Sequence, residues 1–384
     1  MRHEPSSAPR PFREKGEAQE DVLGQLWPFS SSSLPPNLLI GQCRRPVTPL
    51  LGGSEEVISF NLRGEALRIQ SPTQIHKPRN QIIAAQKMAS DSIASTFKVI
   101  DSHLHIWASP QQAAHKYPYF PGNEPPVPAD LHFLLNSMGE AGVDGAMIVQ
   151  PINHKFDHSF VTSVLREYPS KFIGCCLANP EEDGGGVQQL EHLITKEGYR
   201  AVRFNPYLWP SGEKMTNQIG KLIYSKAGEL GTPVGIMCMK GLDLHLTEIK
   251  ELCTEFPSTV VLLDHLAFCK PPLNDEESLT FSELLKLSKF PQVYIKFSAL
   301  FRVSRSSYPY EDLSQVLSKV VSSFGANRVM WGSDFPFVVD ECGYKESKEA
   351  VSLIASKIPL SPAELEWIMG RTALELFQGH WLCS

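Results

Sequence analysis

The chain has 384 residues, of which 42% are hydrophobic and 20% charged, and its 36 basic and 42 acidic residues give a formal net charge of −6. This composition is typical of a soluble globular protein and excludes a chain that is disordered throughout. The mild acidity, without a block of lysine or arginine, argues against nucleic acid as a partner, and no apolar run approaches the roughly 18 residues of a membrane span.

Residues 1–96 differ in composition from the rest of the chain. They hold 10 of the 30 prolines and a serine run at 30–33, and they cannot bury enough apolar surface to offset the entropy of ordering. We predict a largely disordered extension. Two interpretations of it are open: a plastid targeting segment, which its acidic first part does not fit, or an upstream extension that precedes a true start at Met88. We prefer the second, and the sparse cysteines favour the cytoplasm.

From Phe97 onward, short β-rich runs alternate with helix-length segments, which is typical of a parallel sheet built from βα units. The predicted strands are residues 97–105, 145–150, 172–178, 201–205, 233–238, 259–264, 293–298 and 328–332. The predicted helices are residues 159–168, 186–196, 218–230, 242–256, 282–288, 310–324, 345–356 and 361–377. Eight such units without a G-x-G-x-x-G turn favour a closed (β/α)8 barrel of residues 97–384 over a doubly wound sheet.

Histidines and acids are predicted at the C-terminal ends of the strands, where barrels of this kind place their active sites. Asp101, His103 and His105 alternate along the first strand, so we expect them to share the interior face. Two such imidazoles can converge on one cation or one substrate oxygen; the alternative is a pair of structural core histidines. His265 follows the sixth strand. Asp334 follows the eighth, as an active-site carboxylate or a helix N-cap, and the poor helical start after it favours the carboxylate.

Basic residues lie near the same rim: Arg203 after the fourth strand, Lys240 after the fifth, Lys296 within the seventh and Arg302 just after it. In an acidic protein they suggest an anionic small-molecule substrate, whose carboxylate Arg203 can bind in a bidentate pair. The alternative is that they are solvated loop residues, with Lys296 paired to an acid on a neighbouring strand.

Two loop residues at this end of the barrel are candidate substrate-binding residues. Tyr119 lies in an aromatic loop after the first strand, and His154 follows the second strand. Both can orient a substrate. The alternative, left open by the sequence, is a lid that is packed by its own aromatic side chains.

Three motifs together resemble the amidohydrolase superfamily: D-x-H-x-H-x-W at the first strand, D-H after the sixth and W-G-S-D-F-P at the eighth. The resemblance covers about residues 98–377. It is greatest to the branch of 2-pyrone-4,6-dicarboxylate lactonase and the sugar-acid lactonases, and to plant amidohydrolase family proteins.

The resemblance implies a hydrolase that opens a lactone or related ester with water activated by Asp334. It implies that His103 and His105 ligate a metal or polarise the substrate and that His265 is the sixth-strand catalytic histidine. Metal-binding members carry a histidine at the end of the fifth strand, where this chain has Met-Cys-Met-Lys at 237–240. We therefore expect at most one divalent ion such as zinc, held by His103, His105 and Asp334, or a metal-free reaction as the lactonase branch implies.

Two other functions stay open. Similar barrels act as metal-dependent decarboxylases of aromatic or unsaturated acids. A catalytically inactive barrel with a binding role is the second alternative, because the fifth-strand histidine is missing.

We expect that removal of residues 1–87 leaves a barrel of unchanged stability, because that segment has no periodic apolar pattern that could dock on a barrel wall. Thermal unfolding of the full-length and truncated proteins measures the effect. A large drop in the melting temperature of the truncated protein would contradict the expectation.

Overall fold

The computed structural model describes residues 97–181 and 185–381. All the predicted strands and helices fall within these ranges. The predictions made for residues 1–96, including the disordered extension and its targeting role, lie outside the described residues.

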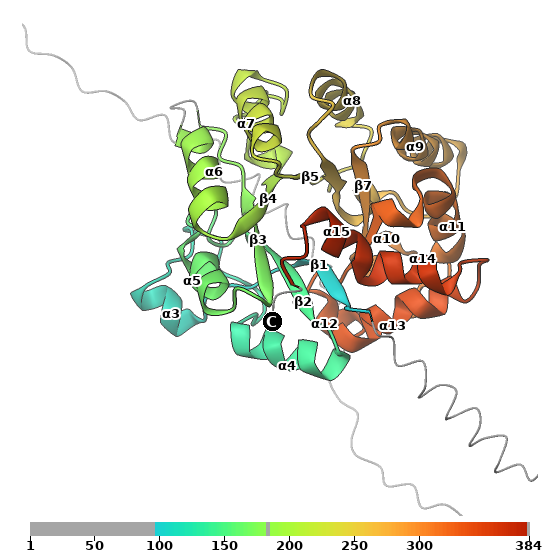
Figure 1. The fold of residues 1–384 in the computed structure, drawn as a ribbon, viewed down its shortest axis with the longest axis horizontal. Coiled ribbons are helices and arrows are strands. Elements are labelled where there is room, and N and C mark those ends of the chain that lie inside the picture. The colour runs from blue at the N-terminus through green and yellow to red at the C-terminus, as the bar shows by residue number, and fades with distance from the viewer. Residues whose placement is uncertain (1–96, 182–184, 382–384) are drawn as a thin grey trace, which may run out of the picture. The chain divides into compact units, whose positions relative to one another are not determined.

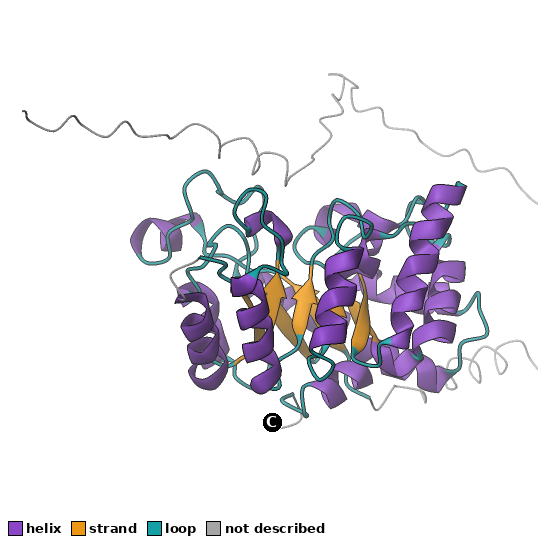
Figure 2. Cartoon of the chain, turned by 90° about the horizontal axis from the view of Figure 1, so that it is seen from above, coloured by secondary structure: helices purple, strands orange, loops and turns teal. Residues whose placement is uncertain are grey.

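Eight parallel strands follow one another in chain order in a single sheet, with helices around the outside (Figures 1 and 2). This confirms the predicted (β/α)8 barrel. The strands are β1 (Ile100–Leu104), β2 (Gly145–Val149), β3 (Phe172–Leu177), β4 (Tyr199–Phe204), β5 (Val234–Ile236), β6 (Val261–Leu263), β7 (Val293–Ser298) and β8 (Val329–Gly332). The helices are α3 (Pro110–His115), α4 (Leu131–Ala141), α5 (Ser159–Glu167), α6 (Gly185–Lys196), α7 (Gln218–Glu229), α8 (Leu246–Glu255), α9 (Asp275–Lys286), α10 (Leu300–Val303), α11 (Leu313–Phe324), α12 (Val338–Glu341), α13 (Tyr344–Ala355), α14 (Pro362–Glu366) and α15 (Thr372–Leu376).

The barrel has an inner and an outer apolar layer because side chains alternate along each strand. In β2, Met147 and Val149 belong to the inner layer, whereas Ala146 and Ile148 pack against the helices. The helices present matching stripes. In α11 the buried residues follow a helical period: Leu313, Val316, Leu317, Val320 and Phe324.

Helices α3 and α4 were not predicted, and each begins after a residue whose side chain caps its first turn. Helix α4 begins after Asp130, whose side chain accepts a hydrogen bond from the backbone of Phe133, and it ends at Gly142 with a left-handed φ of 64°. Helix α9 begins after the N-cap Asn274, seven residues earlier than predicted. The prediction missed its first turn because that turn is acidic and carries no apolar stripe. The last predicted helix is divided by a π-helical turn over Trp367–Arg371.

The end of the described chain closes the barrel at the end opposite the loops that follow the strands. The buried Trp381 and Phe377 pack in the inner layer with Ile100 and Met330. The Nζ atom of Lys98 donates a hydrogen bond of 2.6 Å to the carbonyl oxygen of Trp381. In the described part of the chain, no helix is long and apolar enough to cross a membrane.

We expect Trp381→Ala to lower the free energy of unfolding by about 3–5 kcal/mol, because it opens a cavity in the inner layer of the barrel. Urea unfolding followed by circular dichroism measures the change. The control is Leu353→Ala, which truncates a side chain of α13 that is 43% exposed. Equal stability of the two variants would show that Trp381 does not close the barrel.

Candidate active site

Strand β1 carries an extra residue just where its histidines begin. Asp101 pairs with Ala146 and Leu104 with Ile148, so β1 advances three residues while β2 advances two, as in a β-bulge. The extra residue shifts the alternation of side chains, and Asp101 points outward, where its Oδ2 accepts a hydrogen bond of 3.0 Å from the hydroxyl of Tyr344 in α13. The prediction that Asp101 shares the interior face with His103 is therefore wrong.

The carboxylate of Asp101 instead joins the first and last strands. Its Oδ1 accepts hydrogen bonds from the backbone N–H groups of His103 (3.0 Å) and Ser333 (2.9 Å). Beside it, the N–H of Asp334 donates to His103 O at 2.8 Å and the N–H of His105 donates to Phe335 O at 2.7 Å. These bonds close the barrel and fix His103 in β1 and His105 just after it next to Asp334.

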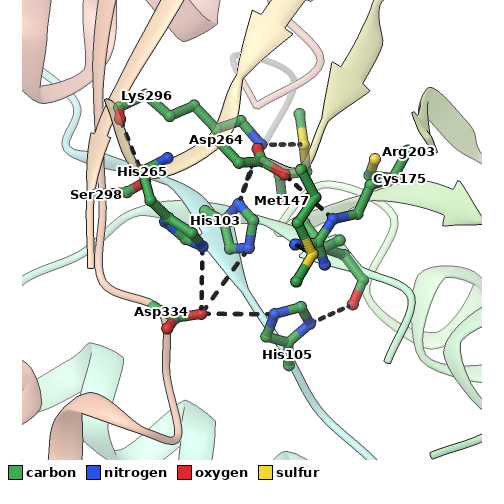
Figure 3. Close-up of polar contacts among 12 residues, drawn as sticks. His103, His105, Met147, Cys175, Arg203, Asp264, His265, Lys296, Ser298 and Asp334 are labelled. Carbon is green, nitrogen blue, oxygen red and sulfur yellow. Dashed lines mark hydrogen bonds and ion pairs between the residues drawn. The ribbon is translucent and has the colours of Figure 1, made fainter. Parts of the chain in front are cut away.

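Three imidazoles surround one carboxylate oxygen at the C-terminal ends of the strands (Figure 3). Oδ1 of Asp334 lies 3.5 Å from Nε2 of His105 and 3.9 Å from Nε2 of both His103 and His265. All four side chains are buried, with exposed fractions of 9% or less. The structure thus brings together the four residues that the sequence marked as catalytic.

Left-handed backbone conformations aim two of these side chains inward. His265 has a φ of 52° and Asp334 a φ of 64°. A residue with a Cβ atom rarely adopts this conformation, which costs roughly 1–2 kcal/mol. Strain of this size is typical of residues whose side chains are held for function.

The electrostatic environment keeps Asp334 ionised. Burial alone would raise its pKa, but Arg302, His265 and His105 together lower the pKa well below the usual range of a carboxyl group. Nε of Arg302 donates a hydrogen bond of 2.7 Å to Oδ2 of Asp334. Burial lowers the pKa of His265 to about 4, against the opposing effect of Asp334. At neutral pH the site therefore holds a carboxylate beside a neutral His265.

A second buried carboxylate, Asp264, lies deeper in the barrel behind His103. Its Oδ1 is 3.3 Å from Nδ1 of His103 and 3.2 Å from Nζ of Lys296, and its Oδ2 is 3.1 Å from Nε of Arg203. Burial opposes its ionisation, but Lys296, His103 and Arg203 lower its pKa well below the usual range. Asp264 is not among the predicted site residues, although it belongs to the D-H motif.

The structure places two of the candidate substrate-binding cations at Asp264 rather than at the mouth. The side chain of Arg203 is 8% exposed and its Nη2 lies 2.7 Å from Sδ of Met237. Lys296 is 1% exposed. Lys296 thus has the alternative that the sequence left open, a pairing with an acid on a neighbouring strand. The carboxylate of Asp264 holds both Lys296 and Arg203.

The remaining predicted substrate-binding residues lie in the loops. The hydroxyl of Tyr119 donates to the carbonyl of Ala108, and both ring nitrogens of His154 bind backbone atoms, Pro118 O at 3.0 Å and Ala108 N at 3.2 Å. Their polar atoms hold the loop together, which favours the packed lid. Lys240 is exposed, and its Nζ lies 5.0 Å from the centre of the Tyr207 ring.

The donor set at the mouth is compatible with one metal ion. Among the described residues, one atom each of His103, His105 and Asp334 lie within 4.8 Å of one another. Two imidazole nitrogens and a carboxylate oxygen form a ligand set that zinc accepts in catalytic sites, with room for water or substrate. Strand β5 is followed by Met237 and Cys238, so the histidine of metal-binding superfamily members is absent there.

Comparison with known proteins shows the family to which the chain belongs. A family model described as Amidohydrolase matches residues 100–379. A 4-sulfomuconolactone hydrolase from Hydrogenophaga intermedia is 25% identical over 239 residues, which cover 62% of this chain and 74% of that protein. An L-fucono-1,5-lactonase from Burkholderia ambifaria is 31% identical over 265 residues, which cover 63% of this chain and 81% of that protein.

Among solved structures, a putative 2-pyrone-4,6-dicarboxylic acid hydrolase from Pseudomonas putida superposes with a TM-score of 0.60. It is 21% identical, and the match covers 74% of this chain and 98% of that one. At this identity the likeness concerns the fold.

We expect Arg203→Met to lower the free energy of unfolding by about 3 kcal/mol, because it removes one of the cations that compensate a buried carboxylate. Urea unfolding measures this. Lys240→Met, which removes an exposed cation, should change stability by less than about 0.5 kcal/mol. An Arg203→Met protein of unchanged stability would show that Arg203 is not needed to compensate Asp264.

Proposed function

Because the chain belongs to the amidohydrolase family, we propose that it is a hydrolase that opens a lactone, or a related ester, of a small carboxylic acid. The observation that carries the proposal is the convergence of three imidazoles on Asp334 Oδ1 at the catalytic end of the barrel. The names of the two curated relatives support it, since both describe hydrolases of lactones.

Asp334 and His105 are the residues we assign to the attacking water. Nδ1 of His105 lies 2.9 Å from the carbonyl oxygen of Val149, which can only accept, so this nitrogen carries the proton and Nε2 has a lone pair. Nε2 and Asp334 Oδ1, 3.5 Å apart, can therefore each accept one proton of a bound water. The water oxygen then presents a lone pair to the substrate carbonyl, and Asp334 takes the proton as the new C–O bond forms.

His103 is the residue we assign to the carbonyl oxygen. Its Nε2 is buried, faces the same space and has no hydrogen-bond partner among the described residues. An N–H group there stabilises the oxyanion of the tetrahedral intermediate. When the ring C–O bond breaks, the leaving oxygen takes the proton from Asp334. The product is a hydroxy acid, which releases one proton near neutral pH.

The basicity of Asp334 favours an ester over an amide. Arg302 and the imidazoles lower the pKa of Asp334 well below its usual range, although burial opposes them. This keeps the carboxylate available but makes it a weak base, and general-base catalysis declines with basicity. A weak base suffices where the leaving group departs readily, as in an activated lactone, whereas an amide also requires protonation of its nitrogen.

Arg302 is the cation best placed for an anionic substrate. Its side chain is 31% exposed, and its guanidinium carbon lies 4.9 Å from the ring centres of Phe301 and of Phe337. Only its Nε is needed for the bond to Asp334, and the fork of a guanidinium has further N–H donors for a carboxylate. We place the acid group of the substrate at Arg302, with Lys240 at the outer edge of the mouth.

We further propose that the site takes at most one divalent ion, such as zinc, at His103, His105 and Asp334. The ligand atoms are close enough for one ion, and Arg302 engages only Oδ2 of Asp334, so Oδ1 is available. When bound, such an ion would polarise the carbonyl and lower the pKa of its water. The donor and acceptor roles assigned above are those of the metal-free site, because an ion would occupy the same nitrogen and oxygen atoms.

We expect Asp334→Asn to lower kcat for lactone opening by about 100-fold or more, because an amide cannot accept the proton of water. A panel of lactones with a pH indicator measures kcat as proton release. Asp340→Asn, the same change at an exposed acid of α12, is the control and should retain full activity. Full activity of Asp334→Asn, or release of CO2 in place of acid, would exclude the proposed reaction.

A further inference from the structure

His103 in β1 and His105 just after it have different neighbours at Nδ1. At His105 the neighbour is a backbone carbonyl, so Nδ1 donates and Nε2 has the lone pair. Nδ1 of His103 lies 3.3 Å from both Nζ of Lys296 and Oδ1 of Asp264 (Figure 3). An ammonium only donates and a carboxylate only accepts, so these two neighbours favour opposite tautomers of His103.

The surroundings of Lys296 favour one of the two tautomers. Its ammonium has three N–H donors and is 1% exposed, and a buried N–H without an acceptor is destabilising. Three acceptors lie near Nζ: Asp264 Oδ1 at 3.2 Å, His103 Nδ1 at 3.3 Å and Met147 Sδ at 3.9 Å. A proton on Nδ1 of His103 would remove one of these acceptors. The N–H of the imidazole and an N–H of Lys296 would then point at each other.

Asp264 does not require a proton from His103. Lys296 lies 3.2 Å from its Oδ1, and Arg203 lies 3.1 Å from its Oδ2. Two cations therefore compensate one buried carboxylate. The carboxylate is therefore compensated without a proton from His103, whose neutral imidazole can accept at Nδ1.

We propose that Lys296 is a positioning residue that holds His103 with its proton on Nε2. A metal-ligating histidine binds through a lone pair and commonly donates its other N–H to a carbonyl or carboxylate. His105 has that arrangement with Val149, but at His103 an ammonium takes the place of the acceptor. Lys296 thereby lowers the affinity of the site for a metal ion and makes Nε2 of His103 a hydrogen-bond donor to the substrate.

The donor role of His103 rests on the proposed hydrolysis of a lactone, whereas the tautomer and the metal affinity do not. Both can be measured without substrate. Failure of the lactone assay would therefore leave this inference standing, and a wrong tautomer would leave the lactone assay unaffected.

The first experiment compares zinc binding by the full-length wild type, Lys296→Met and the double variant Lys296→Met/Asp264→Asn, in competition with a chromophoric chelator. We expect Lys296→Met to bind one zinc ion per chain about 10- to 100-fold more tightly than the wild type, because Asp264 then accepts the proton of Nδ1. The double variant keeps the net charge of the wild type, and its Asn oxygen can still accept this proton. It should also bind zinc more tightly than the wild type.

Two outcomes of this comparison overturn the inference. One is a Lys296→Met protein whose zinc affinity equals that of the wild type. The other is a double variant that returns to the wild-type affinity, because the effect of Lys296 would then be one of charge alone. Circular dichroism establishes that each variant is folded.

The second experiment measures the tautomer in the wild-type protein. Nitrogen NMR of protein with isotope-labelled histidine distinguishes protonated from unprotonated ring nitrogens, and loss of a signal in His103→Gln assigns His103. We expect His103 protonated at Nε2 and His105 protonated at Nδ1. A signal of His103 with the proton on Nδ1 would overturn the inference whatever the zinc affinities are.

Discussion

The bonds between the first and last strands determine both the barrel and its site. Oδ1 of Asp101 accepts from the backbone of β1 and from Ser333, and two backbone bonds beyond the end of β8 join His103 and His105 to the segment that carries Asp334. Because these bonds form at the C-terminal ends of the strands, closing the barrel and assembling the site are one event. Residues 232 positions apart in the chain become hydrogen-bonded neighbours at this seam.

Behind this seam, a buried cluster of charges fixes the orientation of His103. Taking a carboxylate, an ammonium and a guanidinium out of water is costly, and their mutual attraction repays this only when each partner is well placed. Asp264 meets that requirement with Lys296, Arg203 and His103 at 3.1–3.3 Å. A buried cluster of this kind adds little to the free energy of unfolding. Its role is better explained by the orientation of His103, whose Nε2 faces Asp334.

The sequence was sufficient to predict the architecture and the convergence of four side chains. It was not sufficient to predict the residues that hold these side chains in place. Period-two runs separated by helical periods predict eight βα units, and the polar ends of β1, β6 and β8 must meet at one rim in such a barrel. The bulge in β1 left no signal, since one extra residue changes the facing of Asp101 without changing the pattern of residue types. Arg203 in β4 and Lys296 in β7 were predicted near the rim, yet Asp264, which follows β6, holds both of them. Pairing across strands depends on side-chain reach, which spacing along the chain does not reveal.

Three residues at the site have a Cβ atom and yet adopt a left-handed backbone conformation, which such residues disfavour. Residues with positive φ follow three successive strands: His265 after β6, Ala299 after β7 and Asp334 after β8. Glycine would adopt these conformations without strain, but it would remove the imidazole and the carboxylate on which the proposed reaction depends. Ala299 carries no reactive group; it precedes α10, the short helix that returns Arg302 to Oδ2 of Asp334. The three strained residues therefore serve one carboxylate, that of Asp334. They place the imidazole of His265 near its Oδ1 and the guanidinium of Arg302 at its Oδ2.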